Sequence, residues 1–191
     1  MSRPVLQIIS ASTRAGRKGI AVARWFQRFA EQHGGFDVEL VDLAEVGLPV
    51  FDEPNHPRLR QYVHQSTKDW SATVSRADAF VFVTPEYNHS FPASLKNALD
   101  HLSAEWADKP AGLVSYGGVS AGLRAATAIK PVLAALRMLP VVEAVSIPFF
   151  AQFLTEDDEF APNTELEAGA KAMLDELARV TPALRSLRDA A

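Results

Sequence analysis

The chain has 191 residues, 48% of them hydrophobic, which is enough for one domain with a substantial core. Its formal net charge of −4 argues against nucleic acid as a partner, and the absence of cysteine excludes disulfides, thiolate metal sites and a cysteine nucleophile. No run of about 18 apolar residues predicts a membrane-spanning helix, and no secretion signal precedes the first strand, so we expect a cytoplasmic protein.

The first part of the chain has the pattern strand, helix, strand. Val5–Ile9 is an apolar run typical of a strand, and a polar, basic loop follows it. A helix with a buried stripe is expected over Gly19–His33, with glycine at its end. Phe36–Asp42 alternates apolar and polar residues, which favours an outer strand. The turn-rich stretch Pro49–Pro57 then leads to a polar helix that ends near Thr73.

The second part of the chain continues this alternation. Three further strands are expected, at Ala79–Val83, Ala111–Tyr116 and Val141–Ile147. Helical spacing of apolar residues follows Pro92 and Ser120, and Pro131 predicts a kink in the second of these helices. A last helix is expected over Glu165–Leu187, with an interruption at Pro182.

Strands that alternate with helices predict a parallel α/β sheet with right-handed crossovers. Five strands and short loops favour a flavodoxin-like three-layer sandwich with strand order 2-1-3-4-5 over a six-stranded dinucleotide fold. No repeat or linker divides the sequence, so residues 1–191 are expected to form a single domain. In this strand order, the loops after strands one, three and four meet at the ligand-binding edge of the sheet.

The loop after the first strand, Ser10–Gly19, carries hydroxyls, two arginines and a lysine just before a helix N-terminus. Free N–H groups and the helix dipole favour an anion there, and arginine can add a bidentate contact. The glycine patterns of the P-loop and of dinucleotide-binding turns are both absent. The loop therefore favours the single phosphate of a mononucleotide, and a solvated basic loop is the alternative.

The other two loops suit a flat ring. In Thr84–Pro92, Tyr87 and Asn88 could stack on and hydrogen-bond to a heterocycle, although packing and capping of a turn would use the same residues. In Ser115–Gly122, the paired glycines allow the backbone to approach a ring closely, and a tight strand-to-helix turn is the alternative. Together the three loops provide a phosphate end and a ring end.

At this point the sequence resembles the NADPH-dependent FMN reductases, a flavodoxin-like family with azo-, quinone- and chromate-reducing members. The motifs that carry the resemblance are Ser12-Thr13-Arg14 with Gly16 and Gly19, Pro85–Asn88, Ser94–Asp100 and Ser115–Gly118. Their order matches as well, so the resemblance extends to about residue 150. It implies an enzyme that passes a hydride from NADPH to bound FMN, and then electrons to a flavin, quinone, azo compound or metal oxyanion.

The resemblance also assigns cofactor-binding residues. The FMN phosphate would be held by Ser12, Arg14, Arg17 and the Gly19 amide. The ring and ribityl chain would contact Pro85, Glu86, Tyr87 and Asn88 on one side, and Ser115, Tyr116, Gly117 and Gly118 on the other. No catalytic side chain and no metal ligand is expected. The resemblance implies a homodimer or tetramer, in which Phe149, Phe150 and Phe153 would belong to the interface or to the core.

Three alternatives use the same residues differently. A flavodoxin-type electron carrier and a flavin-free binding protein both fit the fold. Gly118–Gly122 satisfies the G-x-S-x-G pattern of a serine hydrolase, but all five histidines precede Ser120, against the order of that triad. A helix cap is therefore the favoured role of Ser120. The loosely spaced Asp52, Glu53, His56 and His64 are interpreted as a solvated polar connection rather than a metal site.

Overall fold

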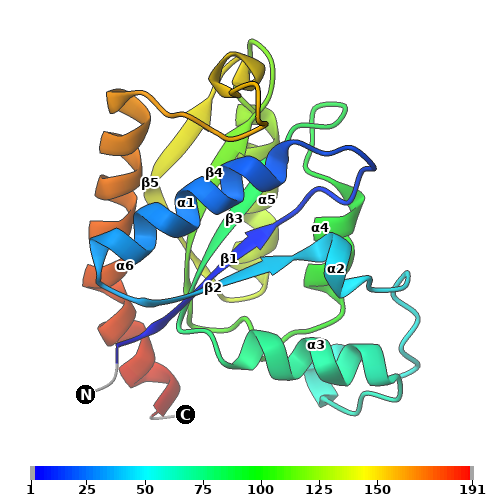
Figure 1. Ribbon diagram of the computed structural model, residues 1–191. Helices are drawn as coiled ribbons and strands as arrows, with labels where there is room; N and C mark the ends of the chain where they lie inside the picture. Colours follow the sequence, from blue (N-terminus) through cyan, green and yellow to red (C-terminus); the bar gives the residue numbers. More distant parts are fainter. Residues whose placement is uncertain (1–2, 190–191) are drawn as a thin grey trace.

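Five parallel strands form the central layer of the computed structural model, which describes residues 3–189 (Figure 1). The strands are β1 (Val5–Ser10), β2 (Asp37–Asp42), β3 (Ala79–Pro85), β4 (Pro110–Tyr116) and β5 (Leu139–Ile147). They pair in the order β2-β1-β3-β4-β5, and every ladder is parallel. The predicted fold class and strand order are therefore confirmed, while the single domain over residues 1–191 stays a prediction.

Helices cover both faces of the sheet. They are α1 (Gly19–His33), α2 (Leu43–Val46), α3 (Gln65–Ser75), α4 (Ala93–Asp100), α5 (Leu123–Ala135) and α6 (Thr164–Asp189), with short 3₁₀ turns η1 (Pro57–Leu59) and η2 (Phe150–Phe153). Apolar residues of α1 and α6 pack on one face, and those of α3, α4 and α5 on the other. Among the described helices, none combines the length and hydropathy that a bilayer crossing requires.

The central strands are apolar on both sides because both faces are covered. All of β3 is buried, with Val81 in the core under α1 and α6 and its neighbours Phe80 and Phe82 in the core under α3, α4 and α5. On the second side, Trp106 is fully buried and packs against both of these phenylalanines. The two cores fix the sheet rigidly, so the loops at its carboxyl edge project from a stable base.

The predicted interruption at Pro182 is wrong, because α6 continues through this residue to Asp189. Proline removes one backbone hydrogen bond from a helix interior, and its ring clashes with the carbonyl four residues earlier. The preceding residue, Thr181, is buried and its hydroxyl donates to the Leu177 carbonyl at 2.6 Å. Leu177 is itself fully buried against the sheet, so packing retains the helix at this point. At Pro131, α5 is also continuous, and the kink stays a prediction.

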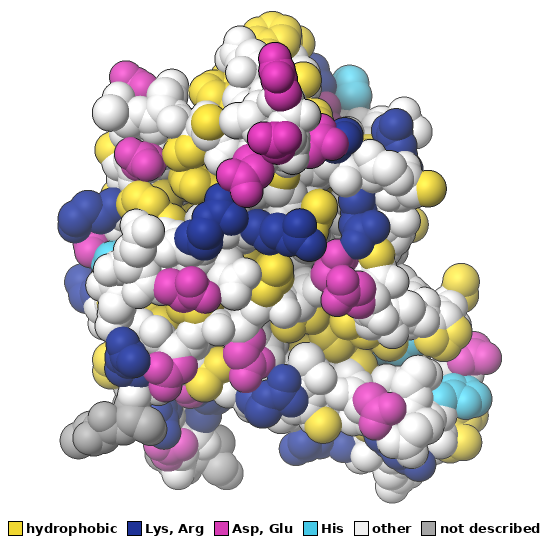
Figure 2. All heavy atoms as spheres, viewed as in Figure 1, with side chains coloured by type: hydrophobic (Ala, Val, Ile, Leu, Met, Phe, Trp, Pro, Cys, Tyr) yellow, Lys and Arg dark blue, Asp and Glu magenta, His cyan; other side chains and the backbone are white. Residues whose placement is uncertain are grey.

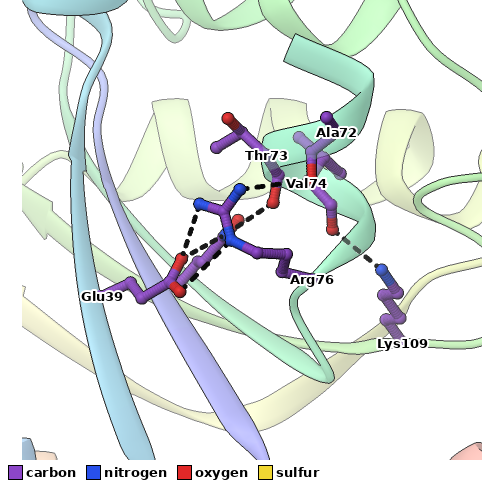
Figure 3. Close-up of polar contacts among 7 residues, drawn as sticks. Glu39, Ala72, Thr73, Val74, Arg76 and Lys109 are labelled. Atoms are coloured by element: carbon purple, nitrogen blue, oxygen red, sulfur yellow. Dashed lines mark hydrogen bonds and ion pairs between the residues drawn. The ribbon is translucent and has the colours of Figure 1, made fainter. Parts of the chain in front are cut away.

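Lys109 is buried just before the start of β4, at the amino end of the sheet, and its side chain points towards α3 (Figure 3). Only 4% of the residue is exposed, its Nζ donates to the Val74 carbonyl at 3.0 Å, and it lies 5.4 Å from the centre of the Phe80 ring. Burial lowers the pKa of Lys109 to about 8, the Arg188 charge lowers it further, and nearby carboxylates offset this only in part. The folded protein therefore contains a charged amine in an unfavourable environment at neutral pH.

We expect Lys109→Met to raise the free energy of unfolding at pH 7 by about 1 to 3 kcal/mol. The Val74 carbonyl stays satisfied, because it also accepts the Ala77 N–H at 3.2 Å. In the wild type, the pKa of Lys109 is lower in the folded state, so the unfolded state binds more protons above pH 8 and stability rises with pH. The stability difference between variant and wild type should therefore shrink from pH 8 towards 10.

Urea unfolding at several pH values measures this difference. Lys68→Met is the matched control, because Lys68 is exposed on α3 and its removal should leave the pH dependence unchanged. A stability difference for Lys109→Met that is constant from pH 7 to 10 would contradict a lowered pKa of Lys109 in the folded protein.

Candidate functional site

A cavity of about 600 Å³ opens at the carboxyl ends of β1, β3 and β4. Its walls come from four loops and comprise Ser12, Arg14, Gly16–Gly19, Pro85–Tyr87, Tyr116–Gly118 and Phe149–Gln152. The first three loops are those that the sequence singled out. They meet because β1 lies between β2 and β3, at the point where the chain reverses its direction of winding.

One end of the cavity lies at the start of α1. Lys18 occupies the N-cap position, but its side chain makes no capping hydrogen bond to the helix, and the first turn of the helix has no acidic residue. The N–H groups of this turn therefore lack a side-chain acceptor, and an anion is the partner that they and the helix dipole favour. Gly19 leaves room for the Tyr116 phenol beside this turn, since a Cβ there would lie 1.8 Å from the Tyr116 hydroxyl oxygen. The backbone and the phenol together form a cradle suited to a phosphate.

The cations at this end differ in their partners. The Arg17 guanidinium pairs with Asp42, whose side chain is only 4% exposed, and the buried Arg17 Nε has no hydrogen-bond partner. Lys18 pairs with Asp158 at the surface. Arg14 is exposed, and within residues 3–189 no carboxylate forms an ion pair with it. Its charge is therefore available to a bound phosphate.

Further basic residues follow along α1 outside the cavity (Figure 2). A smaller hollow of about 310 Å³ lies between α1 and the segment before α6, with Arg24 and Arg28 on one wall and Asp157–Glu159 on the other. The Lys18–Asp158 ion pair joins the two walls. Because charges of both signs face this hollow, it has no strong preference for an anion. The start of α1 is therefore the part of this edge best suited to an anion.

The ring end is formed by the loops after β3 and β4. The hydroxyls of Tyr87 and Ser12 are 2.8 Å apart and share a hydrogen bond, which joins the two ends of the cavity. Tyr87 and Ser90 exchange backbone hydrogen bonds of 2.8 and 3.0 Å across a tight turn. Asn88 lies in that turn with a φ of 48°, a conformation that asparagine tolerates, and it does not line the cavity. The structure thus places Asn88 in the turn that holds Tyr87.

Tyr116 forms the floor between the two ends. It is 4% exposed, and its ring packs against Phe150 with 5.0 Å between the ring centres. Burial raises the pKa of Tyr116 above its ordinary value, so the phenol keeps its proton and can donate a hydrogen bond. Ser115 is buried behind the floor, where its hydroxyl donates to the Ala121 carbonyl at 2.8 Å, and it does not line the cavity.

Comparison with known proteins decides the family. Residues 5–152 match the model of the NADPH-dependent FMN reductases, and every residue of the cavity falls within this range. The chain belongs to this family. The match confirms the resemblance drawn from the sequence motifs, and with it an oxidoreductase that uses FMN and NAD(P)H.

Individual relatives agree with the family assignment. The reductase is 40% identical over 149 residues to an NAD(P)H-dependent FMN reductase of Schizosaccharomyces pombe, a match that covers 76% of this chain and 74% of the relative. It is 30% identical over 159 residues to an FMN-dependent NADPH-azoreductase of Staphylococcus aureus, covering 83% and 80%. The solved structure of FerB, a flavoenzyme NAD(P)H:(acceptor) oxidoreductase of Paracoccus denitrificans, superposes with a TM-score of 0.73 at 21% identity, covering 94% and 98%. This last likeness supports the fold.

The fourth wall of the reductase's cavity was not assigned to a ligand by sequence reasoning. Phe149–Gln152 follows β5 and is held against the glycine turn, because the Phe149 and Phe150 N–H groups donate to the carbonyls of Gly118 and Gly117 at 3.0 and 3.1 Å. Phe149 has a φ of 44°, a left-handed conformation that a bulky residue rarely adopts. The signal that could have found this wall is its position at the carboxyl end of a strand neighbouring β4. Phe153 packs against the core instead.

The favoured helix-cap role of Ser120 in the reductase is not what the structure shows. The N-cap residue of α5 is Gly122, and the Ser120 hydroxyl donates to the Glu86 carboxylate at 2.9 Å. Ser120 lies two residues before the N-cap position, because the chain makes an extra turn through Ala121 and Gly122, which both have positive φ. In the described part of the chain, no histidine is hydrogen-bonded to Ser120, so the geometry gives no support to a hydrolase.

Proposed function

We propose that the cavity binds FMN with its phosphate at the start of α1 and its ring between the loops after β3 and β4. NAD(P)H and a small-molecule acceptor would then react there in turn. The observation that carries the proposal is that one cavity has two suitable ends. One is an uncapped helix N-terminus beside Arg14, which forms no ion pair within residues 3–189, and the other is lined by aromatic residues and glycines. Its volume of about 600 Å³ lies within the usual range for cofactor sites.

At the phosphate end, the Ser12 hydroxyl and the Gly19 amide would donate hydrogen bonds, and Arg14 would supply the charge. Arg17 would act mainly by holding Asp42 at the end of β2. The buried Tyr116 phenol, which remains protonated, is a further donor towards the phosphate cradle. Each of these groups is neutral or positive, as the charge of a phosphate requires.

At the ring end, Pro85–Tyr87 would contact one edge of the ring, and Gly117 and Gly118 the other. The Gly118 N–H makes no backbone hydrogen bond within residues 3–189, so it is free to donate to a carbonyl of the ring. FMN supplies the hydride-transfer chemistry when bound, and the protein supplies orientation and electrostatics. No side chain of the cavity has to act as acid, base or nucleophile.

The acceptor that we propose is a flavin, quinone, azo compound or metal oxyanion. The azoreductase names of several relatives support an acceptor of this kind. We also propose a cytoplasmic homodimer or tetramer. Phe149, which lines the cavity, is exposed, as are Val119 in the loop after β4 and Leu123 at the start of α5, and a second copy would cover such apolar side chains. Sedimentation of the purified protein tests the oligomeric state.

The purified protein should bind FMN and show the visible absorption band of oxidised flavin. Anaerobic addition of NADPH or NADH should bleach this band, and addition of a quinone or azo dye should restore it. A bound flavin that neither nucleotide reduces would instead indicate an electron carrier. A protein that binds no flavin would contradict the proposal and indicate a flavin-free binding protein.

A further inference from the structure

The N-terminus of α5 is capped by a residue from a different loop. Its own N-cap residue, Gly122, has a φ of 77° and no side chain to offer. The Arg124 N–H, at the second position of the helix, donates instead to Glu86 Oε2 at 3.1 Å. A carboxylate near a helix N-terminus is favoured by the free N–H groups and the dipole. Glu86 therefore takes the position that an aspartate or serine usually occupies within the same helix.

Glu86 receives hydrogen bonds from three donors. Besides the Arg124 N–H, the Ser120 hydroxyl donates at 2.9 Å and the Arg124 guanidinium forms an ion pair with the carboxylate. The side chain of Glu86 is only 9% exposed. Burial opposes its charge, but the hydrogen bonds from Arg124 and Ser120 outweigh this and hold the pKa of Glu86 below its usual value. The carboxylate is thus ionised at neutral pH.

These bonds connect two walls of the cavity. The β3–β4 ladder ends with the pair Pro85 and Tyr116. Beyond it, among residues 3–189, the hydrogen bonds that join the loop after β3 to the loop after β4 and the start of α5 all involve the side chain of Glu86. Glu86 stands between Pro85 and Tyr87, which line one wall, and its partners follow Gly117 and Gly118, which line the other.

We propose that Glu86 is a positioning residue whose bonds to Ser120 and Arg124 set the separation of the two loops that flank the flavin ring. The inference rests on the proposed position of FMN. It adds an action of the Glu86 side chain through α5 to the ring contact proposed for Pro85–Tyr87. Ser120, which resembled a hydrolase nucleophile in sequence, is then part of the same positioning contact.

A double-mutant cycle tests the proposal through the FMN dissociation constant, measured by quenching of flavin fluorescence. Glu86→Ala should weaken FMN binding by about tenfold, and Arg124→Ala, which removes the guanidinium but keeps the backbone N–H, should weaken it less. The double variant should be no weaker than Glu86→Ala, because the guanidinium contact is already lost in that variant. Glu86→Gln should recover part of the affinity, since its amide oxygen can still accept the Arg124 N–H. The absorption band of the bound flavin should shift in Glu86→Ala and return in Glu86→Gln.

The exposed ion pair Glu176–Arg179 on α6 is the control cycle, and its variants should leave FMN affinity unchanged. Wild-type affinity in folded Glu86→Ala, or additive effects of the two substitutions, would overturn the proposal. Amide hydrogen exchange of the FMN-free protein gives an independent result, in which Glu86→Ala should accelerate exchange at Arg124. If the wild type binds no FMN, the proposed function fails. Unchanged exchange at Arg124 in Glu86→Ala would separately refute the capping of α5 by Glu86.

Discussion

Replacing Arg14 with alanine is expected to weaken FMN binding by about 100-fold, while stability of the FMN-free protein changes by less than about 0.5 kcal/mol. Hydrogen bonds to a charged group contribute about 1.5 to 3 kcal/mol, and the upper part of this range corresponds to about 100-fold in the dissociation constant. Arg14 is exposed and forms no ion pair with the carboxylates of residues 3–189, so its removal breaks no charge pair within the protein.

Compared with Arg14→Ala, Arg17→Ala should lower the stability of the protein more and its FMN affinity less. Its loss leaves the Asp42 carboxylate buried, with the Ala44 N–H as its remaining donor, so the free energy of unfolding should fall by about 2 kcal/mol. FMN affinity should fall less than in Arg14→Ala. Fluorescence quenching and urea unfolding measure the two effects, and Arg28→Ala, on the exposed side of α1, is the control. If Arg17→Ala loses more FMN affinity than Arg14→Ala, the phosphate charge has been assigned to the wrong arginine.

The fold could be predicted from the sequence because each strand is indicated by the pattern of a whole run of residues. Ala79–Val83 has no polar residue, which is expected only of a strand with both faces covered, and β3 is fully buried in the structure. Phe36–Asp42 alternates, and β2 is an edge strand. The error at Pro182 came from a rule about a single residue. The rule counts a lost hydrogen bond and a ring clash, but burial of Leu177 and its neighbours on α6 keeps the helix against the sheet despite both.

The cavity could be predicted for a topological reason. Parallel strands deliver their following loops to one edge, so the loops after β1 and β3 had to meet that after β4. The direction of each side chain in those loops could not be predicted in the same way. Glu86 and Arg124 are 38 residues apart, and their contact depends on the turn through Gly122. Phe149–Gln152 belongs to no motif, and only its place after β5 brings it to the cavity.

Gly122→Ala is expected to lower the free energy of unfolding by about 3 kcal/mol and to abolish measurable FMN binding. The φ of 77° at Gly122 costs a residue with a side chain about 1 to 2 kcal/mol. The new Cβ would also lie 2.8 Å from the Tyr116 nitrogen and 2.9 Å from both the Tyr116 oxygen and the Ser115 Cβ. Since the first two are backbone atoms at the end of β4, the overlap can be relieved only by moving the turn, which adds about 1 to 3 kcal/mol.

Gly34→Ala separates these two contributions. Gly34 has a similar φ of 74°, but the nearest atom to its new Cβ would be the Gln32 carbonyl oxygen at 4.0 Å. This variant should lose only about 1 kcal/mol and keep its FMN affinity, because Gly34 lies at the far end of α1 from the cavity. The excess loss in Gly122→Ala then measures how rigidly the turn is held by β4 and by Glu86. Equal stabilities of the two variants with FMN binding intact would show that the turn yields to a side chain, and so cannot fix one wall of the flavin site.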